Sequence, residues 1–238
     1  MIRRPLILLA ATAAILGAAP IAAQAAEMPT TWDNLVQVKA KNLQAVYLLP
    51  GADFRAYTKI MLDPTEVDFV KGWVKQINQN YGFAYGRTDD ADAAAIAKQV
   101  RIGFDQIFAK AFTKAGYQVV TEPGPDVLRL STAVFNLFIT APRSVTMSPG
   151  VNVRTVDAGS ASVLIQVRDS ETGQVLGRAL DVRTAGATDN YLPRTPSGNQ
   201  ADFGILFDRW ADISVKGLEK LKAMSPVDPT GQPAKPAP

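Results

Sequence analysis

The sequence predicts an α+β protein, a two-layer sandwich in which two amphipathic helices pack on one face of a mainly antiparallel sheet. Three observations support this prediction. Residues 161–184 have the pattern of a β-hairpin, residues 127–139 have that of a long strand, and residues 89–114 and 202–221 each carry one apolar helical stripe. A sheet with one apolar face and helices with one apolar stripe bury both by packing in two layers.

The chain begins with the features of a secretory signal peptide. Basic residues precede an uninterrupted apolar run over residues 6–19, and Ala23-Gln24-Ala25 forms a small-x-small cleavage signal. The apolar run is shorter than the ~20 residues of a membrane-spanning helix. We therefore favour a signal peptide, residues 1–25, that is cleaved after Ala25 or Ala26, rather than an uncleaved membrane anchor. Because there is no cysteine to lipidate, we expect a periplasmic or secreted bacterial protein with no stable membrane anchor after cleavage.

The first part of the mature chain gives weaker signals. Residues 27–42 scatter apolar side chains among polar ones and predict a strand-poor arm. Short apolar runs over residues 45–49 and 57–62 predict strands, which we place at an edge of the sheet. Residues 78–88 are rich in glycine and tyrosine and predict a loop.

Two helices are predicted from apolar side chains at spacings of three and four. The first begins at Asp89, where acidic residues complement the helix dipole, and ends before Gly116. A short strand over residues 117–120 follows it. The second helix is predicted to be capped by Asp202, and its apolar stripe comprises Leu206, Trp210, Ile213, Gly217 and Leu221.

The central strands give the strongest β signal. Apolar and polar residues alternate over residues 161–168, with Leu164 as the one exception, and the turn formers 169–173 lead into a return strand over 175–184. The preceding strand, residues 127–139, is apolar on both faces from Ala133 onward, which predicts that this part is covered on both sides.

The remaining segments are two long loops and a C-terminal tail. Two long connections that carry proline and glycine, residues 141–159 and 185–200, are of the kind that often serves function. Residues 225–238 are rich in proline and predict a disordered tail. We therefore expect a single α/β domain over residues 26–224.

Composition excludes several classes of enzyme. The chain has no cysteine and no histidine, so thiol nucleophiles, Ser-His-Asp mechanisms and His-ligated zinc are all excluded. Without Arg3 and Arg4 of the leader, basic and acidic residues are nearly balanced and form no basic stripe, so we expect no nucleic-acid partner. Only carboxylate, lysine, tyrosine or Ser-Lys chemistry remains, and Ser214-Val215-Lys216 lacks the spacing of a Ser-x-x-Lys motif.

Three stretches carry a family resemblance. Residues 57–67 (YTKIMLDPTEV), 124–130 (GPDVLRL) and 168–173 (RDSETG) resemble the signatures of a family of small secreted bacterial proteins, many of them lipoproteins, known as domain of unknown function 3313. The resemblance extends over residues 47–221 and implies an envelope location and a mixed α/β domain. It brings no established catalytic residues, and because the lipidated cysteine is missing here, the lipid anchor of other members does not carry over.

Two groups of carboxylates are candidate sites. Asp63, Glu66 and Asp68 form either a cation or acid/base site or a turn followed by a cap; we favour the turn, because the glycine-punctuated spacing of oxygen-ligand metal sites is absent. Asp89, Asp90 and Asp92 pose the same choice, and helix capping already explains them. We therefore expect neither metal nor cofactor.

Two aromatic stretches are candidate contact surfaces. Tyr81, Phe83 and Tyr85 alternate in a glycine-rich stretch, and Tyr191 and Arg194 lie in the second long loop. Each set either contacts a partner or packs on the core.

The sequence thus favours a non-catalytic periplasmic binding or interaction module. We expect its long loops to contact another envelope protein or a cell-wall component. The alternative is a carboxylate-dependent hydrolase of cell-wall glycan or peptide that uses two of Asp63, Glu66 and Asp68.

Overall fold

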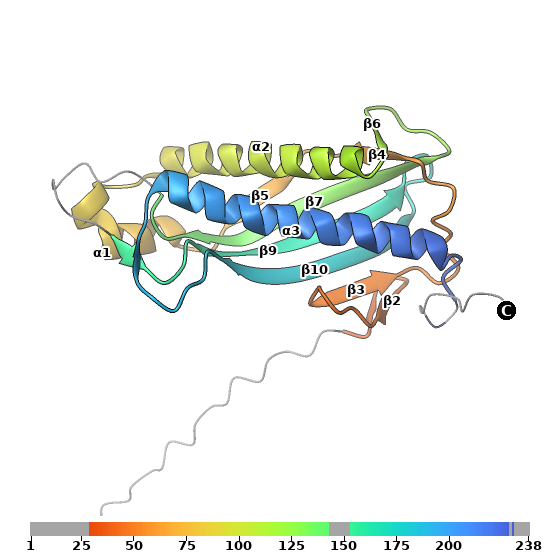
Figure 1. Ribbon diagram of the computed structural model, residues 1–238, viewed down its shortest axis with the longest axis horizontal. Coiled ribbons are helices and arrows are strands. Elements are labelled where there is room, and N and C mark those ends of the chain that lie inside the picture. The colour runs from red at the N-terminus through yellow and green to blue at the C-terminus, as the bar shows by residue number, and fades with distance from the viewer. Residues whose placement is uncertain (1–28, 143–152, 229, 231–238) are drawn as a thin grey trace, which may run out of the picture.

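The structure is a computed structural model that describes residues 29–142, 153–228 and 230 (Figure 1). The side chains of residues 83–85 lie outside this description. The predicted signal peptide, with its cleavage site at Ala25 or Ala26, and most of the predicted tail also lie outside the described residues.

The described chain is an α+β sandwich, as predicted, with three helices packed on a mixed, mostly antiparallel sheet. The nine-stranded sheet has the order β1-β2-β3-β10-β9-β7-β4-β6, and β5 pairs with β7 beyond β4. Its strands are β1 (Thr31–Trp32), β2 (Leu35–Val38), β3 (Ala45–Leu48), β4 (Lys59–Leu62), β5 (Glu66–Phe69), β6 (Gln118–Val120), β7 (Val127–Ile139), β9 (Gly159–Asp169) and β10 (Val175–Ala185). A separate pair joins β8 (Arg154–Thr155) to β11 (Leu192–Pro193).

Strands β7, β9 and β10 form the centre of the sheet and confirm the predicted meander. Strand β9 pairs antiparallel with both neighbours along nearly its whole length. The predicted strands near Tyr47 and Ile60 add on opposite sides, where β3 pairs antiparallel with β10 and β4 pairs parallel with β7. The parallel pairs β4–β7, β4–β6 and β5–β7 make the sheet mixed rather than purely antiparallel.

Helices α2 (Asp90–Lys114) and α3 (Pro196–Ala223) lie side by side on one face of the sheet, while α1 (Trp73–Tyr85) lies at one end (Figure 1). The predicted cap of α2 is present as a capping box, in which the backbone N–H of Asp92 donates to Asp89 (2.9 Å) and that of Asp89 donates to Asp92 (3.1 Å). The layer between helices and sheet is rich in fully buried aromatic side chains: Phe104, Phe108, Phe203, Phe207 and Trp210.

The N-terminal segment corrects the prediction of a strand-poor arm. It forms β1 and β2, which extend the sheet beyond β3. Leu35, Ala45 and Tyr47 make a small second core, against which Trp32 packs edge-on to the Tyr47 ring. Burial of these side chains is what gives the short strands a fixed register.

Two further element predictions were wrong. Residues 78–85 belong to helix α1, because Trp73 and Ile77 are buried and anchor it despite the glycine at position 82. Helix α3 begins at Pro196 rather than at Asp202; Thr195 accepts a hydrogen bond from the N–H of Gly198 (3.0 Å) and caps it. Proline at the first helical position is favourable because its missing N–H would have no helical partner there.

The packed domain also continues past residue 224. Val227 is buried, and its backbone exchanges hydrogen bonds with Gly51 and Ala52 (both 2.8 Å). The domain therefore includes at least the first three residues of the segment predicted as a tail.

Candidate functional site

A large cavity lies between the C-terminal half of α3 and the sheet. Its volume is about 970 Å³, and it is bounded by α3, by β3, β10, β9 and β7, and by the β2–β3 connection at residues 39–43. Its walls are mainly apolar and include Val46, Leu130, Ile165, Val167 and Leu221. The cavity is open to solvent on one side, and its volume is within the range of ligand pockets.

The cavity arises from a change of side-chain size along α3. In the first half of the helix, Phe203, Phe207 and Trp210 reach down and fill the space above the sheet. One turn later no aromatic side chain of α3 faces the same space; the helix lines it with the small residues Ser214 and Gly217 together with aliphatic side chains such as Leu221. Gly217 lines the cavity and is itself exposed, and a Cβ added there would meet no atom within 4 Å, so a larger side chain meets no steric obstacle at this position.

The mouth of the cavity is lined by four lysines. Lys39 and Lys41 stand on the β2–β3 connection, and Lys216 and Lys220 stand one turn apart on α3. No aspartate or glutamate is among the described residues that line the cavity. Among the residues that the structure describes, Lys216 is the only one of the four lysines with a carboxylate partner, Asp212 at 3.9 Å, and both side chains of that pair are exposed.

A fifth cation at the cavity, Arg178, is already engaged. Its guanidinium contacts Asp33 (2.5 Å) and Gln166 (2.7 Å) and lies over the Trp32 ring. Because side chains alternate along a strand, residue 178 points to the sheet face opposite Ala179, which packs in the helix-side core. Arg178 therefore holds β1 on the sheet, and the cations at the mouth of the cavity are the four lysines.

Asp181 holds the edge of the cavity in place. This buried carboxylate accepts hydrogen bonds from the indole N–H of Trp210 (2.8 Å) and the backbone N–H of Gln44 (3.2 Å), and it pairs with Arg183 (2.6 Å). It thereby ties the end of the β2–β3 connection to α3. The sequence had placed Gly217 in the apolar stripe of this helix, and a glycine at such a position was the available signal that the stripe does not fill its side of the core.

The three carboxylates near residue 63 do not form a joint site. Asp63 accepts hydrogen bonds from Arg129 (2.9 Å) and Ser131 (2.6 Å). Burial raises the pKa of Asp63, but these bonds and the charge of Arg129 outweigh it and hold the pKa below its ordinary value. Glu66 and Asp68 are on β5, where both are exposed. Among the residues that the structure describes, no three Asp or Glu side chains come together to hold a metal ion.

The first aromatic stretch lies on helix α1 rather than in the predicted loop. Tyr81 is half-buried against the main core, and this burial raises the pKa of its hydroxyl. The side chains of Phe83 and Tyr85 lie outside the described residues, so their role as a contact surface stays a prediction.

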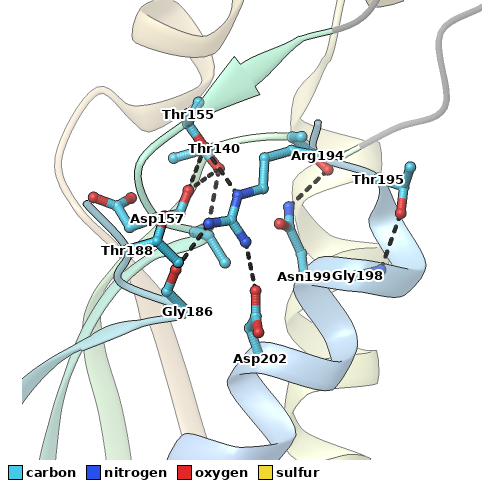
Figure 2. A network of polar contacts seen from close by, with 12 residues as sticks. Thr140, Thr155, Asp157, Gly186, Thr188, Arg194, Thr195, Gly198, Asn199 and Asp202 are labelled. Carbon is cyan, nitrogen blue, oxygen red and sulfur yellow. Dashed lines mark hydrogen bonds and ion pairs between the residues drawn. The ribbon is translucent and has the colours of Figure 1, made fainter. Parts of the chain in front are cut away.

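The second stretch divides into an exposed and a buried residue. Tyr191 is 66% exposed, whereas Arg194 is 8% exposed and points inward (Figure 2). The guanidinium of Arg194 donates to Thr155 (3.1 Å), Asp202 (2.5 Å) and the carbonyl of Gly186 (2.8 Å). The guanidinium of Arg194 therefore holds this loop to α3. A contact between the loop and a partner stays a prediction, and Tyr191 is the exposed residue of the two.

The sequence matches the model of a family described as "Protein of unknown function (DUF3313)" over residues 27–213. The chain belongs to this family. No curated protein matches the sequence at a significant level. No helix in the described part of this DUF3313 chain is long and apolar enough to cross a membrane.

Several solved structures resemble the DUF3313 chain distantly. The PelC dodecamer from Paraburkholderia phytofirmans shares 15% identity, covering 69% of this chain and 94% of that one, with a TM-score of 0.34. A minor lipoprotein from Acinetobacter baumannii shares 13% identity over 69% and 94% of the two chains, with a TM-score of 0.33. A putative neuraminyllactose-binding hemagglutinin homolog from Helicobacter pylori shares 10% identity over 74% and 92%, with a TM-score of 0.34.

Proposed function

We propose that this protein is a non-catalytic binding module of the bacterial cell envelope and that it takes up an apolar ligand in the cavity beneath α3. The observation that carries the proposal is the cavity itself, about 970 Å³ with mainly apolar walls. This volume lies at the upper end of the ~300–1,000 Å³ range of ligand pockets, which are typically apolar with a few polar groups at defined places.

The chemistry of the cavity supports binding rather than catalysis. Its described lining offers lysines but no carboxylate, so it lacks the acid and base pair that the hydrolase alternative needs. Asp63, the strongest candidate for that pair, is held by Arg129 and Ser131 instead. The predicted signal peptide supports the envelope location, and the exposed Tyr191 loop is the surface on which we expect an envelope partner.

The proposal is tested by filling the cavity from Gly217. The full-length protein is expressed in a bacterial host, purified, delipidated and titrated with the uncharged fluorescent probe N-phenyl-1-naphthylamine. We expect saturable binding by the wild type and at least tenfold weaker binding by Gly217→Phe, because Gly217 lines the cavity and a ring at this position takes up part of its volume.

Gly204→Phe is the matched control. Gly204 lies on the same helix, also faces open space, and is about 20 Å from Gly217 at about 1.5 Å per residue. It should bind the probe like the wild type. If the wild type does not bind the probe, or if both variants bind equally well, the cavity is not a ligand site and the proposal fails.

A further inference from the structure

We infer that the ligand of the α3 cavity is an acyl lipid with an anionic headgroup, whose chain enters the cavity while its headgroup stays at the mouth among Lys39, Lys41, Lys216 and Lys220. This inference rests on the proposed function and names the class of ligand. It is carried by the contrast between the cavity's apolar walls and its lysine mouth.

The four lysines approach the mouth from two sides. Lys216 and Lys220 are at i and i+4 on α3, where two like charges repel each other and destabilise the helix. Lys39 and Lys41 face them from the β2–β3 connection. An anion at the mouth relieves the repulsion within each pair, because it attracts both members at once.

The helix dipole accounts for only part of this arrangement. A cation in the last turn of a helix is favourable, and Lys220 lies in the last turn of α3. The helix dipole cannot explain Lys39 and Lys41, because they belong to no helix and have no ion-pair partner among the described residues. The positive charge of Lys39 and Lys41 at the mouth therefore needs another explanation, and the binding of an anionic ligand provides it.

The apolar walls of the cavity determine the chemistry of the part of the ligand that enters it. A charged or strongly hydrated group would lose its hydration on entering this apolar space and would find too few hydrogen-bond partners there. A ligand that is polar throughout, such as a sugar phosphate, therefore does not fit. A ligand with an apolar chain and one anionic end satisfies the walls and the mouth together.

The test compares two lipids that differ in net charge. The delipidated full-length protein is loaded with N-phenyl-1-naphthylamine, and the probe is displaced with 16-carbon lysophosphatidylglycerol, which is anionic, or 16-carbon lysophosphatidylcholine, which is zwitterionic, both kept below their micelle concentrations. We expect the anionic lipid to displace the probe at about tenfold lower concentration, because several exposed ion pairs each contribute a small amount. This preference should shrink in concentrated salt, which screens exposed charges.

Paired lysine variants locate the effect. Lys216→Gln with Lys220→Gln, and Lys39→Gln with Lys41→Gln, should each reduce the preference for the anionic lipid severalfold, with displacement by each lipid referred to the same variant's own affinity for the uncharged probe. Lys98→Gln with Lys110→Gln is the matched control, since both residues are exposed on α2 and do not line the cavity. The control should keep the full preference.

Each other outcome overturns the inference. Equal displacement by both lipids, with normal probe binding, would leave the proposed function standing and refute the anionic headgroup. An equal loss of preference in the α2 control would assign the effect to overall charge. Probe binding that appears only after residues 229–238 are removed would mean that the chain's own C-terminal segment fills the cavity, and both proposals would then fall.

Discussion

The two halves of helix α3 cover the same sheet in opposite ways. Over residues 196–211 the helix is sealed to the sheet by aromatic side chains and by the buried Arg194 network (Figure 2). Over residues 212–223 it covers the cavity with small and aliphatic side chains, without an aromatic one, and presents lysines at the mouth. The comparison teaches that an amphipathic stripe orients a helix, whereas side-chain volume along the stripe determines whether the layer beneath is filled.

The largest expected difference between the halves comes from truncating an apolar side chain. Trp210→Ala removes a fully buried ring and leaves Asp181 without its indole donor, so we expect a loss of about 4 kcal/mol in the free energy of unfolding. Leu221→Ala, at the half-buried wall of the cavity, should cost about 1 kcal/mol. Urea denaturation measures both, and equal losses would show that the two halves are packed alike.

Breaking an ion pair should also destabilise the protein more in the first half of α3 than in the second. Arg194→Met leaves the Asp202 carboxylate and the Gly186 carbonyl without their buried donor, which should cost about 3 kcal/mol. Lys216→Met breaks a pair whose side chains are both exposed, and its effect should stay within about 0.5 kcal/mol. Comparable effects in urea denaturation would contradict the assignment of Arg194 as the residue that holds the loop.

A methyl group added to the sealed half should be destabilising. Gly186 has a positive φ of 59°, and a Cβ there would lie 2.1 Å from the carboxylate of Asp202. Gly186→Ala should therefore cost about 2 kcal/mol through backbone strain and displacement of that carboxylate. Thermal unfolding gives the readout, and an unchanged midpoint would mean that the network around Arg194 is loose.

A smaller effect of opposite sign is expected for the same substitution in the open half. Gly217→Ala removes backbone freedom from the unfolded chain and meets no atom within 4 Å, so it should stabilise the protein by about 0.5–1 kcal/mol. Gly204→Ala on the same helix should give a similar gain. A loss at position 217 alone would indicate that the space opposite it is already occupied.

Patterns that are local in the sequence predicted their elements well. The capped helix from Asp89, the strand over residues 127–139 and the hairpin over 161–184 are all present, since periodicity and turn residues encode them directly. Helix α1 was missed because glycine and tyrosine suggested a loop, and tertiary burial of Trp73 and Ile77 overrides that local preference.

Features that depend on distant residues could not be predicted. The burial of Arg194 requires Asp202, Thr155 and the Gly186 carbonyl to converge from separate segments. The cavity likewise depends on which side chains of the sheet stand opposite Ser214 and Gly217. Sequence patterns contain these residues, but only the fold brings them together.

Strand β7 has a consequence for how the chain folds. On one edge it pairs with β9, and on the other edge it receives β4 and then β5 in parallel. Partners such as Ile60 and Leu128 are separated in the chain by both α1 and α2, so their pairing must close a long loop, whereas the β9–β10 hairpin closes a short one. We therefore expect the hairpin to fold first and to serve as the template for β7, with the parallel edge assembling last.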